Sequence, residues 1–183
     1  MLTDFQKKKL GRLFAVLDAD HNNQLERSDY TDVVSNLASL HGWKEGSTEY
    51  SKVETLYLTI WGNLKALADA NADGKVSLEE FLEFHAMMLS TPEMYEQITV
   101  GTVELLFEAF DRDSNGHLSR DDFRDFFASY RIRDHAAADE AFQKLDVSGR
   151  GQISKEDALQ RVQEFYFSND PAAAGNWLFG SYD

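Results

Sequence analysis

The feature that most constrains this chain is a twelve-residue pattern that recurs four times along its 183 residues. Each copy begins with Asp, places Asp, Asn or Ser two residues later, has an aliphatic eighth residue and ends on a carboxylate. The copies cover residues 18–29, 69–80, 111–122 and 146–157, and we number them loops one to four. Such internal repetition predicts four copies of one supersecondary unit.

Apolar residues with helical spacing flank these loops. After loop three, Phe123, Phe126, Phe127 and Tyr130 follow the spacing of a single helix face. No segment alternates between apolar and polar residues for long, and neither proline interrupts a strongly periodic run. We therefore predict an all-α fold of four helix-loop-helix units, arranged compactly in two pairs, with short β-bridges between the paired loops.

The boundary between the two pairs is expected at residues 90 and 91. Thr91 and Pro92 have the character of a helix cap followed by the first helical turn. An N-terminal pair would then span residues 1–90, with loops 18–29 and 69–80. A C-terminal pair would span residues 91–183, with loops 111–122 and 146–157 and a packed C-terminal tail.

The residue types in the loops match the coordination chemistry of calcium. This cation takes roughly six to eight oxygen ligands, and a twelve-residue loop supplies them from positions 1, 3, 5, 7, 9 and 12. Position 7 uses its carbonyl group, and position 6 needs a positive φ that favours Gly. Loop two matches throughout, loop three differs only in ending on Asp122, and loop one carries Asn23 in place of Gly. Asn is well suited to a left-handed conformation, so the pattern predicts metal in all three.

We predict about three bound calcium ions per chain, with magnesium as a competitor. The shorter Asp at position 12 of loops one and three favours six-coordinate magnesium, whereas Glu at that position favours calcium. At position 7 we expect the ammonium of Lys75 and the imidazole of His117 to face solvent. The candidate ligands are Asp18, Asp20, Asn22, Gln24 and Asp29 in loop one, Asp69, Asn71, Asp73, Lys75 and Glu80 in loop two, and Asp111, Asp113, Asn115, His117 and Asp122 in loop three.

Loop four departs furthest from the pattern. Ser148 at position 3 is a weak neutral ligand, and Arg150 places a fixed cation at position 5, where an oxygen should stand. Gly151 and the apolar Ile153 remain. We therefore expect loop four to keep its structural role without binding metal.

Composition narrows the range of partners. A formal net charge of −14 disfavours nucleic acids and anionic membranes and favours cations. The absence of cysteine excludes disulfides and thiolate chemistry. The chain shows no signal peptide, membrane-spanning stretch or catalytic constellation. We expect a cytoplasmic, monomeric protein that is not an enzyme and has no dedicated protein partner.

Taken together, the loops and their flanking helices resemble the EF-hand superfamily. The enlarged connection between loops one and two and the total length look more like sarcoplasmic calcium-binding proteins than calmodulin. The stretches 163–167 and 175–180 are similar to the ends of bacterial calerythrin-type proteins. The resemblance implies two EF-hand pairs around an aromatic core and a role in calcium or magnesium buffering and transport. Coelenterazine-binding proteins and photoproteins share this architecture.

Three functions follow as hypotheses. The first is a calcium buffer, the second a calcium sensor that opens a groove for a target protein, and the third a calcium-triggered carrier of a hydrophobic small molecule. Sensors use Met-rich grooves, yet the chain has only 4 Met against 13 Phe. This composition favours the buffer.

The C-terminal tail bears on the same choice. Pro171 to Asp183 carries Trp177, Leu178, Phe179 and Tyr182, which would form a sticky patch if the tail were free in water. We expect the tail to pack on the apolar surface between the two pairs. A groove filled in this way would favour the buffer over the sensor.

Overall fold

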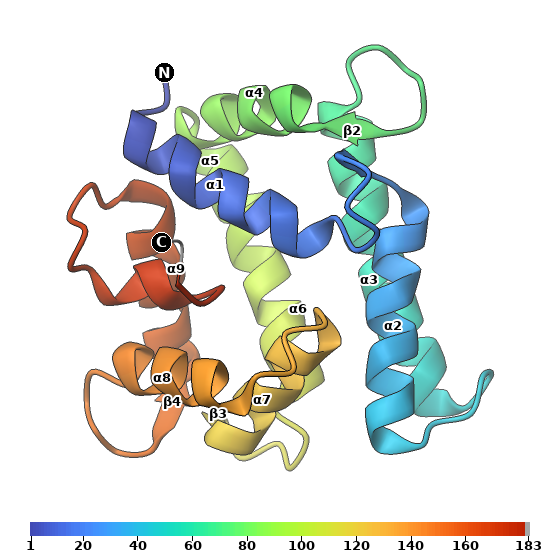
Figure 1. Cartoon of the computed structure of the whole chain (residues 1–183), viewed down its shortest axis with the longest axis vertical. Coiled ribbons are helices and arrows are strands. Elements are labelled where there is room, and N and C mark those ends of the chain that lie inside the picture. The colour runs from blue at the N-terminus through green and yellow to red at the C-terminus, as the bar shows by residue number, and fades with distance from the viewer. Residues whose placement is uncertain (182–183) are drawn as a thin grey trace.

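In the computed structural model, which describes residues 1–181, helices account for most of the chain (Figure 1). None of the described helices is long and apolar enough to cross a membrane. The α-helices are α1 (Asp4–Leu17), α2 (Arg27–His41), α3 (Thr48–Ala68), α4 (Leu78–Leu89), α5 (Pro92–Tyr95), α6 (Gly101–Phe110), α7 (Arg120–Ser129), α8 (His135–Leu145) and α9 (Lys155–Phe167). A π-helical turn, η1 (Glu96–Val100), joins α5 to α6, and a 3-10 turn, η2 (Ala174–Trp177), follows α9.

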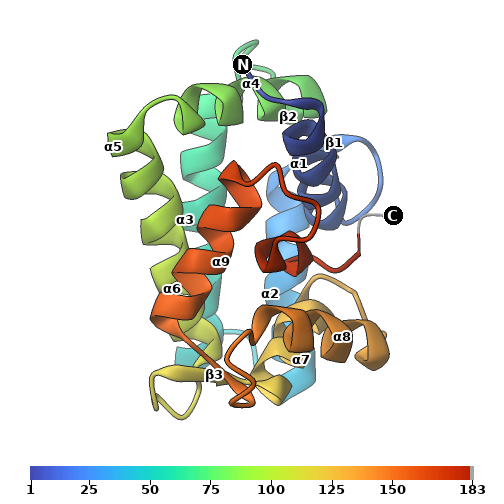
Figure 2. The same ribbon diagram turned by 90° about the vertical axis from the view of Figure 1, so that its left-hand side faces the viewer.

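Two short antiparallel bridges join the loops in pairs. Strand β1 (Gln24–Leu25) pairs with β2 (Val76–Ser77), and β3 (His117–Ser119) pairs with β4 (Gln152–Ser154). In each bridge the aliphatic residues at position 8 face each other, Leu25 with Val76 and Leu118 with Ile153. The two bridges lie toward opposite ends of the long axis (Figures 1 and 2). The predicted all-α fold with β-bridges between paired loops is confirmed.

Helices α2, α4, α7 and α9 begin within loops one to four, and in loops two to four a Ser of the loop caps the helix. A Ser at position 9 accepts a hydrogen bond from the backbone N–H of position 12, and the carboxylate of position 12 accepts one from the backbone N–H of that Ser. This reciprocal arrangement is a capping box, which satisfies two backbone donors that a helix start leaves free. The pairs are Ser77 with Glu80 before α4, Ser119 with Asp122 before α7, and Ser154 with Asp157 before α9.

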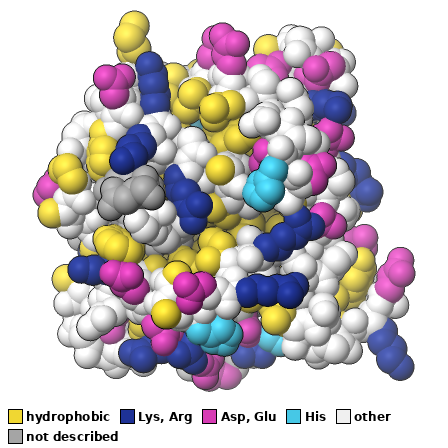
Figure 3. All heavy atoms as spheres, in the orientation of Figure 1, with side chains coloured by type: hydrophobic (Ala, Val, Ile, Leu, Met, Phe, Trp, Pro, Cys, Tyr) yellow, Lys and Arg dark blue, Asp and Glu magenta, His cyan; other side chains and the backbone are white. Residues whose placement is uncertain are grey.

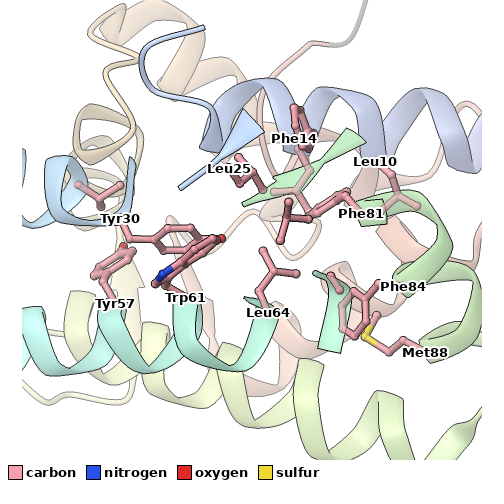
Figure 4. Close-up of a cluster of buried hydrophobic side chains, with 14 of the residues drawn as sticks. Leu10, Phe14, Leu25, Tyr30, Tyr57, Trp61, Leu64, Phe81, Phe84 and Met88 are labelled. Carbon is pink, nitrogen blue, oxygen red and sulfur yellow. The ribbon is translucent and has the colours of Figure 1, made fainter. Parts of the chain in front are cut away.

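The main core joins both halves of the chain. Figure 4 shows its N-terminal part, where Phe14 and Phe81 meet edge to face at 5.5 Å and Trp61 lies against Tyr30. The same cluster includes residues from α6 and α9 of the C-terminal half. A smaller cluster lies under loops three and four and is built mainly from α7 and α8. Because the larger core is shared, the two halves bury apolar surface against each other.

One face of α1 also ties the N-terminal half to the end of the chain. Its N-cap Thr3 and three side chains of the helix, spaced three residues apart, donate to oxygens of the C-terminal segment. The bonds are Thr3 to Asn169 Oδ1, Gln6 to the Tyr166 carbonyl, Lys9 to the Glu164 and Ser168 carbonyls, and Arg12 to the Phe179 carbonyl. Lys9 is only 1% exposed, and this burial lowers its pKa to about 8. Its ammonium therefore relies on the carbonyls at the end of α9.

The described part of the C-terminal tail packs against both halves of the protein. Turn η2 lies against α8 and α9, and Figure 2 shows it folded back beside α9. Phe179 contacts Phe165 and Phe126 with ring centroids 5.5 and 6.1 Å apart, and Leu178 packs against both clusters. Tyr182 and Asp183 lie outside the described residues. The tail thus covers apolar surface where the two halves meet.

The fit of the tail on α9 leads to the first prediction. Gly175 lies so close to α9 that an added Cβ would overlap the Arg161 carbonyl oxygen and approach Glu164 Cβ to 2.7 Å. We expect Gly175→Ala to lower the free energy of unfolding by about 1–3 kcal/mol, because the tail must move away from the backbone of α9. Thermal and denaturant unfolding would measure the change.

Gly62→Ala supplies the matched control. Gly62 is exposed on α3 and has no atom within 4 Å of the added methyl group. The same substitution there should stabilise the helix by about 0.5–1 kcal/mol. Equal stability of the two variants would contradict the docked position of the tail.

Candidate metal centres

All four loops fold around the carboxylate at position 1. In loop two, Asp69 accepts hydrogen bonds from the backbone N–H groups of Asp73 at 3.1 Å and Gly74 at 3.0 Å. In loop three, Asp111 accepts from Asn115 at 3.1 Å and Gly116 at 2.9 Å. These bonds curl the backbone so that the oxygens of positions 1, 3 and 5 gather on one side of the turn.

The backbone at position 6 is left-handed in every loop. Asn23 has a φ of 63°, close to the values for Gly74, Gly116 and Gly151. The prediction that Asn23 can replace Gly is thus confirmed. Position 4 also has a positive φ, which is 59° at His21, and this second left-handed residue was not predicted.

Loop one gathers its acidic groups most tightly. Oxygens of Asp18, Asp20 and Asp29 lie within 4.8 Å of one another, the one such trio of potential ligand groups found in residues 1–181. Asp18 and Asp29 are 4% and 2% exposed. Asp29 accepts from the N–H groups of Ala19 and Glu26 at 2.9 and 2.7 Å, yet its burial raises the pKa of the carboxyl group. A divalent cation would offset the cost of holding these charges in a buried place.

Loop two holds its final carboxylate in a different way. Glu80 Oε1 accepts from the N–H groups of Ala70 and Asn71, while Oε2 accepts from the N–H and hydroxyl of Ser77. The Ser77 N–H is the main reason that the pKa of Glu80 lies below its usual value. Lys75 remains exposed, but its ammonium forms a 2.7 Å ion pair with Glu26 of loop one. The ion pair itself was not predicted; the β1–β2 bridge produces it by bringing the two loops side by side.

Loop three carries a cation next to its position-12 carboxylate. Arg112, at position 2, approaches Asp122 Oδ1 at 3.5 Å and Asp125 Oδ2 at 3.2 Å. The solvent-exposed imidazole predicted for His117 was wrong. The residue is half-buried, and Nδ1 is shielded from solvent without a described hydrogen-bond partner. The ladder with β4 explains this burial, because His117 pairs with Ser154 across it.

Loop four forms the same turn although it lacks the full set of oxygen ligands. Asp146 accepts from the Ser148 hydroxyl at 2.8 Å and from the Arg150 and Gly151 N–H groups. Burial raises the pKa of Asp146, but these hydrogen bonds outweigh it and hold the pKa below its usual value. The turn, the β-bridge and the helix cap of this unit are all retained, as expected for a structural copy.

Two residues that contact loop one were not among the predicted site residues. Glu26 occupies position 9, and its Oε1 lies 3.4 Å from Asn22 Nδ2, so a carboxylate stands where the other loops have Ser. The repeat itself gave this signal, since position 9 is a ligand position that often acts through water. Arg131, from the segment after α7, bonds to the Ala19 carbonyl and Asp32. No sequence pattern indicates these contacts of Arg131, because they form only through packing of α2 on α7.

Helix-loop-helix units joined by β-bridges, with side-chain oxygens at the ligand positions of twelve-residue loops, define a protein of the EF-hand class. Comparison with family models agrees, because two EF-hand domain pair models match residues 7–86 and 85–130. The chain belongs to the EF-hand family and binds calcium through its EF-hand loops.

Its relatives are distant but extend along nearly the whole chain. Calerythrin of Saccharopolyspora erythraea is 23% identical over 169 residues, which cover 91% of this chain and 95% of that protein. Sarcoplasmic calcium-binding proteins II, V, VI, and VII of Branchiostoma lanceolatum are 25% identical over 186 residues, covering 98% of each. The calcium-loaded apo form of coelenterazine-binding protein from Renilla muelleri has a TM-score of 0.77 at 20% identity, covering 98% and 99% of the two chains. That structural likeness shows a shared fold.

The position of Arg112 leads to the second prediction. Arg112→Gln removes a cation that pairs with Asp122 and would repel an incoming calcium ion. Because the pair is partly exposed, we expect affinity at loop three to increase by about threefold to fivefold. Calorimetric titration would measure it, with Asp122→Asn used to identify the heat that belongs to loop three. Arg133→Gln, an equal charge change at an exposed site outside the loops, should leave the affinity unchanged.

Proposed function

We propose that this protein is an intracellular calcium buffer that acts by binding metal and not by catalysis or target recognition. The observation that carries the proposal is the position of the C-terminal tail. Leu178 and Phe179 pack at the meeting of the two halves, where a sensor would receive its target helix. A groove that is already filled by the chain's own residues supports a closed, monomeric protein.

The shared core supports the same proposal. Sensors expose an apolar groove when calcium changes the angle between their helices. Here the larger cluster crosses from α1 and α3 to α6 and α9, so opening either half would expose apolar surface to water. At about 25 cal/mol for each Å² exposed, such opening opposes a sensor mechanism. We also propose that residues 1–90 and 91–183 form the two EF-hand pairs.

For the metal sites, we propose three ions in loops one, two and three, held by the candidate ligands named above together with Glu26. Arg150 supports the exclusion of loop four, because its charge stands at a ligand position. Magnesium is proposed as a competitor at loops one and three, where the Asp carboxylates at position 12 are too short to bind readily with both oxygens.

Changing loop four tests this count. Native mass spectrometry of the natural chain should find three calcium ions, and Arg150→Asp should add a fourth because it restores an oxygen ligand at position 5. Arg133→Asp makes the same charge change outside the loops and should keep three. Four ions in the unmodified chain, or a fourth ion in the Arg133 variant, would contradict the assignment.

The buffer role itself is tested by stability and hydrophobic dye binding. Calcium at about a thousandfold excess over its Kd should add about 4 kcal/mol to the free energy of unfolding, since metal binds the folded chain. For a chain of this length, that amount raises the melting temperature by roughly 8–16 °C. Dye binding should stay level or fall when calcium is added. A rise in dye binding on calcium loading would instead support the sensor.

A ligand carrier is the second candidate, favoured by a specific feature of the core. A cavity of about 220 Å³ lies between the two halves. The coelenterazine-binding protein with the same fold is named for a small organic ligand, which makes this cavity a reasonable place to seek one here. Buffering and carrying are compatible, because none of the candidate metal ligands lines the cavity.

A further inference from the structure

The cavity has an almost wholly apolar wall. Helices from both halves contribute Leu, Ile, Val and Phe side chains, and the tail closes part of it with Leu178 and Phe179. Asn63 on α3, the exposed member of the wall, and the half-buried Thr102 on α6 mark where the cavity reaches the surface. On the face drawn in Figure 3, hydrophobic side chains show through in the middle, among Lys and Arg. Protein interiors are usually packed to the density of organic crystals, so a space of this size needs an explanation.

Arg161 breaks the apolar character of this wall. Its side chain comes from α9 and lines the cavity, although the residue is only 7% exposed. One terminal nitrogen, Nη2, lies 3.3 Å from Glu164 Oε1, whereas Nε has no described hydrogen-bond partner. A buried donor without a partner costs free energy, and a guanidinium group has five N–H donors to satisfy. The unsatisfied donor therefore points to a missing acceptor.

Arg161 supplies the positive charge of a wall whose other polar groups are neutral. Among the described residues that line the cavity, Arg161 is the one with a fixed charge, and none is Asp or Glu. The nearby His85 is held neutral, because burial lowers its pKa to about 4, and its Nδ1 already contacts the Phe81 carbonyl at 2.7 Å. Glu164 is not part of the wall, and its second oxygen accepts from the Gly175 N–H at 2.9 Å. The cavity thus combines a long apolar surface with one positive group.

We propose that this cavity binds a single-chain monocarboxylic acid, with its carboxylate on Arg161 and its hydrocarbon chain along the apolar wall. A cavity of about 150 Å³ accepts benzene, so simple scaling to this cavity gives a chain of about nine carbons. The inference deepens the carrier candidate and is independent of the buffering role, because it involves none of the loop ligands.

The head group follows from the chemistry of the site. A guanidinium group matches a carboxylate in charge and in its planar hydrogen-bond geometry. An alcohol could accept from one N–H group but would add no negative charge beside the guanidinium, and an ammonium head would be repelled by it. A phosphate head would bring a second negative charge that one arginine cannot balance inside an apolar wall.

Calorimetric titration of the whole chain with decanoate tests the proposal. The buffer should contain a calcium chelator, because calcium precipitates long-chain carboxylates. Decanol and decyltrimethylammonium have the same chain length with neutral and positive heads, and each should bind at least about tenfold more weakly than decanoate. Arg161→Met should weaken decanoate by about tenfold or more while leaving decanol nearly unchanged. Arg133→Met, at an exposed site, should change neither.

A second variant separates cavity binding from loss of structure. Ala158 lines the cavity, so Ala158→Phe should fill part of it and weaken decanoate and decanol alike. Circular dichroism and calcium stoichiometry would confirm that both variants remain folded. Equal affinity for decanoate and decanol, or decanoate binding unaffected by Arg161→Met, would overturn the assignment of the head group. Failure of the natural chain to bind decanoate would overturn the proposal, while an unchanged calcium count would leave the buffer role standing.

Discussion

The arrangement of this molecule depends on the carboxylate at position 12 of each loop. In loops two, three and four it pairs with the Ser at position 9 to cap the outgoing helix, so the loop and the helix share one set of hydrogen bonds. The same group would supply a ligand to calcium. Hydrogen bonds within the chain therefore support the loop geometry, and loop four can keep it without a competent ligand set. At loop one, where oxygens of Asp18, Asp20 and Asp29 lie within 4.8 Å of one another, metal would relieve repulsion among the carboxylates.

The two halves are joined by more than a linker. The larger core crosses between them, α1 donates a row of hydrogen bonds to the C-terminal segment, and Arg131 reaches from behind α7 to loop one. Lys9 is part of this contact between the halves. The residue is 1% exposed, and its ammonium donates to carbonyls at the end of α9. Calcium at loop one thus acts on a helix that is fixed to the far end of the chain. Such a joint suits a protein that binds metal and stays closed.

The central cavity is the exception to this close packing. Side chains leave a cavity of about 220 Å³ unfilled between the two halves, beside a buried arginine. Both features lower stability, the first through lost dispersion contacts and the second through an unpaired donor. Costs of this kind are found at functional sites, where local packing rules give way to a ligand. The candidate metal ligands and the cavity are therefore separate sites of the molecule.

The sequence by itself determined the four loops, their flanking helices, the left-handed Asn23 and the loss of ligands in loop four. These features depend on backbone dihedrals and hydrogen bonds within twelve residues, which local sequence specifies. The metal-ligand assignment remains a prediction drawn from the same pattern. Tertiary structure decided the half-burial of His117, the Lys75–Glu26 ion pair and the burial of the Arg161 Nε without a described partner. Each of these depends on how segments distant in sequence pack together, and residue spacing carries no information about the partner that packing will supply.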